Sequence, residues 1–100
     1  MGYQDGVEPG LRTTLKHRKI SLHERADSEG FVYVHWDGDP KYGPGDGLPI
    51  GVLYGMNFSF GGGSWEVLVN QPYQHVVGKG LPDINEAIRT LLLHLSDDYS

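Results

Sequence analysis

The chain has 100 residues, of which 38% are hydrophobic and 21% are charged. A chain of this length builds one domain around one core, which excludes a second domain. The absence of cysteine excludes disulfides, thiolate nucleophiles and cysteine zinc sites.

The distribution of charge is uneven although the net charge is only -5. Residues 12–25 contain five basic residues and one acidic residue, a local charge of +4 (five minus one), whereas the rest of the chain is acidic. The first residues lack the features of a secretory signal, and no stretch approaches the roughly 18 apolar residues of a membrane span. We therefore expect a cytoplasmic protein with no membrane segment.

The amino-terminal quarter of the chain has the least regular pattern of apolar residues. Residues 1–10 contain three glycines and a proline with little apolar material, which predicts a flexible arm preceding a single domain over residues 11–100. Residues 11–24 match neither the helical nor the strand period cleanly. Thr13, Thr14 and the alternation of Ile20 and Leu22 with polar residues favour extended structure.

Alternating apolar residues predict the central strands. Residues 31–36 form one strand, with Phe31, Tyr33 and His35 on one face. Residues 37–49, dense in glycine and proline, form a long loop, which is uncommon in a small domain unless it is functional or disordered.

A β-hairpin is predicted over residues 50–70, with Gly61, Gly62 and Gly63 at its turn. The larger apolar residues of its first strand lie on one face, which we expect to contribute to the core. The predicted core of the sheet comprises Val52, Tyr54, Met56, Phe58, Trp65 and Val67.

The carboxyl-terminal segment has the clearest helical pattern. A short strand is predicted over residues 73–77, and a helix then begins after Asp83, which can cap it with Glu86 in the capping-box position. Its apolar stripe consists of Ile84, Ala87, Ile88, Leu91, Leu92 and Leu95. The sequence thus predicts an α+β fold, a small antiparallel sheet of three to four strands packed on one C-terminal helix.

No motif for catalysis, a cofactor or a metal is complete. Asp37 and Asp39 open like a calcium loop, but Lys41 follows where an oxygen ligand is required. The histidines form no metal-binding pair, and no serine lies in a nucleophile elbow. We therefore expect no enzyme and no cofactor; the one catalytic alternative is a hydrolase built on His35 and Asp37.

The leading hypothesis is a small non-enzymatic interaction protein, an inhibitor, immunity or accessory factor, that binds a partner protein with a basic surface. The expected contact residues are Asp37, Asp39, Tyr42, Asp46 and Leu93. The alternative is a nucleic-acid-binding module that uses a basic amino-terminal strand. Its contact residues would be Arg12, Lys16, Arg18 and Lys19. A homodimer formed by pairing of edge strands is a further expectation.

Overall fold

The computed structural model describes residues 6–24, 30–39, 41–43, 47–56, 63–70 and 73–95. These residues form a five-stranded antiparallel sheet and two helices, which confirms the α+β class and adds one helix and at least one strand to the prediction. The elements are α1 (Pro9–His17), β1 (Ile20–Glu24), β2 (Phe31–Trp36), β3 (Gly51–Met56), β4 (Ser64–Val69), β5 (His75–Leu81) and α2 (Ile84–His94).

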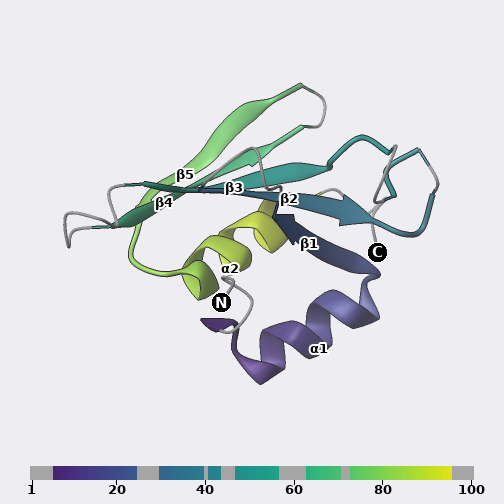
Figure 1. The fold of residues 1–100 in the computed structure, drawn as a ribbon, viewed down its shortest axis with the longest axis horizontal. Coiled ribbons are helices and arrows are strands. Elements are labelled where there is room, and N and C mark those ends of the chain that lie inside the picture. The colour runs from purple at the N-terminus through teal and green to yellow at the C-terminus, as the bar shows by residue number, and fades with distance from the viewer. Residues whose placement is uncertain are drawn as a thin grey trace.

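The sheet is a meander in which the strands lie side by side in chain order, with β1 and β5 at its edges. Both helices cover the same face of the sheet (Figure 1). Helix α2 contacts β3, β4 and β5, and α1 contacts β1 and α2. The core therefore lies between one sheet face and the two helices.

Helix α2 forms as its sequence predicts. The Asp83 side chain accepts a hydrogen bond from the Glu86 backbone N–H at 2.9 Å, which satisfies one of the amide groups at the start of the helix. The Glu86 carboxylate accepts a hydrogen bond from Arg89. The buried residues of the helix all belong to the predicted stripe; they are Ile84, Ala87, Ile88 and Leu91.

The face of β3 that packs on the helices is the opposite of the predicted one. Leu53 is fully buried in the core and lies opposite Val67 of β4. Tyr54 points to the other face, where its ring lies 4.4 Å from that of Phe31, and Val52 is buried on that face as well. The expected contributions of Trp65 and Val67 are confirmed. The expected core side chains of Met56 and Phe58 lie outside the described part.

Residues 11–24 were predicted to be extended throughout, and this is wrong for the first half. Helix α1 starts with Pro9 in its first turn. Proline is tolerated there because N–H groups of the first turn have no hydrogen-bond acceptor within the helix. The hydroxyls of Thr13 and Thr14 donate to the carbonyls four residues earlier, both at 3.0 Å. Burial of Leu15 and these hydrogen bonds outweigh the β-propensity of the two threonines.

Residues assigned to an amino-terminal arm also join the packed domain. Val7 is buried in the core, and the Glu8 carboxylate forms an ion pair with Arg89 of α2. Asn85 accepts a hydrogen bond from the Glu8 backbone and donates one to the Gly6 carbonyl. The start of α1 is thereby fastened to the start of α2.

The junction between α1 and β1 holds a backbone conformation that a lysine rarely adopts. Lys19 has φ 61°, and its N–H donates to the Lys16 carbonyl at 3.1 Å. A left-handed residue directly after a helix is most often glycine, because a side chain is strained there. We expect Lys19→Gly to raise the free energy of unfolding by about 0.5–1 kcal/mol in a urea titration, and a lower value would contradict this account.

Candidate functional site

The turn that follows β2 is fixed to the sheet by backbone hydrogen bonds. The Tyr42 carbonyl accepts from the Trp36 N–H at 3.1 Å, and the Tyr42 N–H donates to Asp39 at 2.9 Å. The Asp37 N–H donates to the Lys19 carbonyl at 2.8 Å. The Leu48 N–H reaches the Lys41 carbonyl at 2.8 Å, so the returning end of the loop is held as well. We call residues 37–39 and 41–43 the β2 turn.

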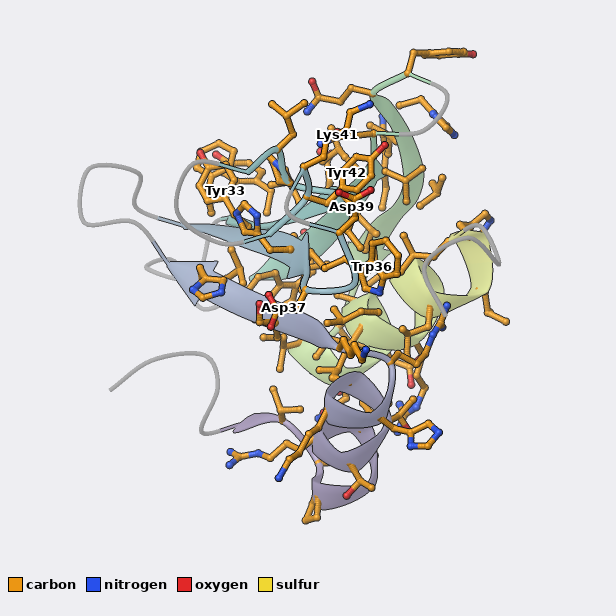
Figure 2. All side chains as sticks on the ribbon, turned by 90° about the vertical axis from the view of Figure 1, so that its right-hand side faces the viewer. Tyr33, Trp36, Asp37, Asp39, Lys41 and Tyr42 are labelled. Atoms are coloured by element: carbon orange, nitrogen blue, oxygen red, sulfur yellow. The ribbon has the colours of Figure 1, made fainter. Side chains whose placement is uncertain are left out.

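The side chains of Asp39, Lys41 and Tyr42 gather in the β2 turn, near Trp36 at the end of β2 (Figure 2). The Asp39 carboxylate accepts from the Lys41 N–H at 2.9 Å, which closes an Asx turn. The half-buried Tyr42 ring lies 6.4 Å from that of Trp36, and the Lys41 ammonium lies 5.4 Å from the Tyr42 ring centre. Asp37 and Asp39 are exposed. The turn thus presents two carboxylates on a fixed backbone.

A groove of about 590 Å³ lies between α1 and the outer edge of β1. Its apolar lining comes from Val7, Leu15, Ile20 and Leu22. Its polar lining comes from Arg12, Lys16, Lys19, Ser21, His23 and Asp37. Four consecutive residues of β1 take part, so the groove follows the strand. We call this feature the α1–β1 groove.

The structure places the predicted contact residues on different surfaces of the molecule. Three of the four basic candidates line the α1–β1 groove, and Arg18 does not. Asp37 lines the same groove, whereas Leu93 lies on α2 with 83% of its surface exposed. Asp46 lies outside the described residues. Sequence reasoning missed His23 and the apolar floor. The spacing of Leu11 and Leu15, one helical turn apart, was a signal that could have revealed α1.

The structure places His35 and Asp37, the pair considered from the sequence for a hydrolase, in different surroundings. His35 is 2% exposed, and its Nδ1 lies 3.2 Å from the Tyr42 carbonyl. Asp37 is exposed at the groove, and no hydrogen bond joins these two described side chains. His35 instead ties β2 to the Tyr42 backbone, which is a structural role.

The pKa of His23 is lowered in the folded protein. Burial lowers its pKa and the neighbouring His35 lowers it further, while Asp37 acts in the opposite direction. Its ring lies 5.5 Å from that of His35, and its Nε2 lies 2.9 Å from the Ser21 hydroxyl. The folded protein therefore favours neutral His23.

This lowered pKa gives stability a definite dependence on pH. As pH falls below the ordinary histidine value of about 6.5, the unfolded chain binds a proton that folded His23 resists, so unfolding becomes easier. We expect stability to fall between about pH 7 and the lower pKa of folded His23, and His23→Gln to reduce that fall. Urea titrations at several pH values measure this change in the free energy of unfolding. An equal dependence on pH in the unaltered protein and in His23→Gln would contradict the assignment to His23.

Within the described residues, no three histidine, aspartate or glutamate side chains gather where they could hold a metal ion. No helix in this part of the chain is long and apolar enough to cross a membrane. Comparison with protein-family models, with curated proteins and with solved structures finds no match. The class that the structure itself defines is an α+β meander with both helices on one face of the sheet.

Proposed function

We propose that the chain is a small non-enzymatic interaction protein that binds a partner protein through the β2 turn. The observation that carries this proposal is the fixation of the turn by the hydrogen bonds among Trp36, Tyr42 and Asp39. A surface that is already ordered loses little conformational entropy when it binds. Such preorganisation is typical of recognition loops on a rigid scaffold.

The chemistry of the turn favours a partner with a basic surface. The exposed Asp37 and Asp39 attract cations, and Tyr42 supplies a large amphipathic side chain that needs little further ordering. Leu48, 60% exposed on the same loop, adds apolar area. In this proposal Asp46 and Leu93 extend the contact. The protein then acts by covering a surface of its partner and carries out no reaction.

Affinity capture with charge-neutral variants tests the proposal. We expect a variant with Asp37→Asn, Asp39→Asn and Asp46→Asn to lose the partner that the unaltered protein captures, because those carboxylates provide the electrostatic attraction. Glu66→Gln on β4 is the matched control, since it removes one negative charge outside the β2 turn. An unchanged partner set for the triple variant would contradict the proposal.

A nucleic-acid-binding module is the second candidate, because the structure gathers Arg12, Lys16 and Lys19 around one groove. Such binding would weaken steeply as salt is added. A gel shift at low ionic strength tests it, and absence of a complex would reject it. A cytoplasmic location and a homodimer formed through an edge strand stay predictions, the latter to be checked by size-exclusion chromatography.

A further inference from the structure

We propose that the α1–β1 groove is a binding site for a small amphiphilic anion, a carboxylate with an apolar chain. The inference concerns a different surface from the proposed partner contact and does not depend on it. The two surfaces share Asp37, and substitution of this residue distinguishes binding at one surface from binding at the other.

The floor of the groove fits an apolar ligand body. Leu15 and Ile20 come from the two elements on either side, and Val7 and Leu22 complete the apolar lining. These side chains are largely buried, so the floor is already formed and its volume of about 590 Å³ is typical of small-molecule sites. An apolar chain laid along this floor would leave water at little cost in protein ordering.

The rim of the groove fits an anionic head group. Arg12 and Lys16 lie one turn apart on α1 and therefore project from the same side of the helix. Lys19 follows at the junction with β1. No ion pair joins Lys16 or Lys19 to a carboxylate in the described part of the chain. Three cations against the single acid Asp37 give the lining a net charge of +2 (three minus one), in a chain whose total charge is -5.

The backbone at Lys19 is a second, independent observation. Its left-handed conformation favours glycine, yet this position holds a cation that lines the groove. Strained residues often occur where the side chain serves binding. We infer that lysine occupies this position for the charge that it brings to the rim.

The combination of an apolar floor and a basic rim favours an amphiphile over nucleic acid as the ligand of the groove. A nucleic-acid backbone is charged along its whole length, and it would leave the four apolar side chains of the floor without a matching surface. The groove lining contains no phenylalanine, tyrosine or tryptophan on which a base could stack, and its one aromatic ring, that of His23, packs edge-on against His35. An amphiphilic carboxylate satisfies both parts of the lining at once.

Titration with octanoate, followed by the methyl NMR signals of Val7, Leu15, Ile20 and Leu22, tests the proposal. We expect these signals to shift together, and 1-octanol, which lacks the charge, to bind about tenfold more weakly. Octyltrimethylammonium should bind more weakly still. Equal binding of octanoate and 1-octanol, or no shift with millimolar octanoate, would overturn the proposal.

Charge variants locate the head group. Lys16→Glu and Lys19→Glu should each weaken octanoate binding about tenfold, whereas Lys79→Glu on the opposite edge strand β5 should change it less than about twofold. Asp37→Asn should strengthen octanoate binding because it removes the one acid of the lining. In the proposed function Asp37→Asn weakens partner capture. Because the two expected effects have opposite signs, failure of the groove proposal and failure of the proposed function give different results.

Lys19→Gly separates binding from folding. This variant should be more stable than the unaltered protein and still bind octanoate more weakly, whereas Lys19→Arg should retain binding. Retained octanoate affinity in Lys19→Gly would contradict a role for the lysine charge. If a twelve-nucleotide DNA strand shifts the groove signals and octanoate does not, the groove is a nucleic-acid site and the proposal is wrong.

Discussion

Leu53→Ala is expected to lower the free energy of unfolding by about 3 kcal/mol, the loss typical of truncating a fully buried leucine. Leu53 has no exposed surface and lies in the core beside Val67. Helix α2 covers this face of the sheet, so removal of three carbon atoms leaves a cavity that the surroundings fill only in part. Urea unfolding followed by circular dichroism measures the change.

Leu93→Ala provides the matched control for this substitution. The chemical change is the same, but Leu93 is 83% exposed, so its truncation should alter stability by less than about 0.5 kcal/mol. Similar losses for the two variants would contradict the orientation of β3. The comparison therefore tests which sheet face the helices cover.

The faces of β3 show where reasoning from hydrophobic pattern stops. Alternation in residues 50–60 predicts a strand and also predicts two faces, but it does not say which face meets the helices. The pattern predicts that the side with more apolar mass, which includes Tyr54, is the core face. The helices instead pack on the side that carries Gly51 and Leu53, where the absence of a side chain at Gly51 lets Leu91 of α2 approach the sheet closely. Tyr54 packs against Phe31 on the other face.

Helix α1 was missed because two periods follow one another without a recognisable boundary. Leu11 and Leu15 are spaced for a helix, whereas Ile20 and Leu22 alternate as in a strand. Glycine commonly marks the end of a helix, and here that position holds Lys19. Helix α2 was predicted correctly because its cap, Asp83, stands directly before an uninterrupted apolar stripe.

The candidate site was predictable in composition and not in geometry. The sequence alone identifies the basic cluster and the acidic turn as separate features. Only the helical form of α1 places Lys16 beside β1, and only the left-handed Lys19 directs the chain back along the sheet edge. Asp37 reaches the same groove because its N–H bonds to the Lys19 carbonyl. These contacts join residues that no local pattern relates.

Gly51→Ala is expected to lower the free energy of unfolding by about 2 kcal/mol, the order of loss seen when a packed core is overfilled. A Cβ at this position would lie 2.8 Å from the Leu68 carbonyl oxygen and 2.9 Å from Cδ1 of Leu91. The carbonyl belongs to the neighbouring strand and has little freedom to move, so β3 and β4 must separate or α2 must shift. Thermal and urea unfolding measure the loss.

Gly10→Ala is the matched control for Gly51→Ala, and its expected effect has the opposite sign. A Cβ at Gly10 meets no atom within 4 Å, and alanine in α1 should raise stability by about 0.5–1 kcal/mol, since it restricts the unfolded chain and favours the helix.

The double variant Gly51→Ala with Leu91→Ala relieves the side-chain contact but not the one with the Leu68 carbonyl. Its loss should therefore be smaller than the sum of the two single losses, because the new methyl group occupies part of the space that Leu91 vacates. Additive losses would show that the sheet backbone, rather than the approach of α2, is what requires glycine at position 51.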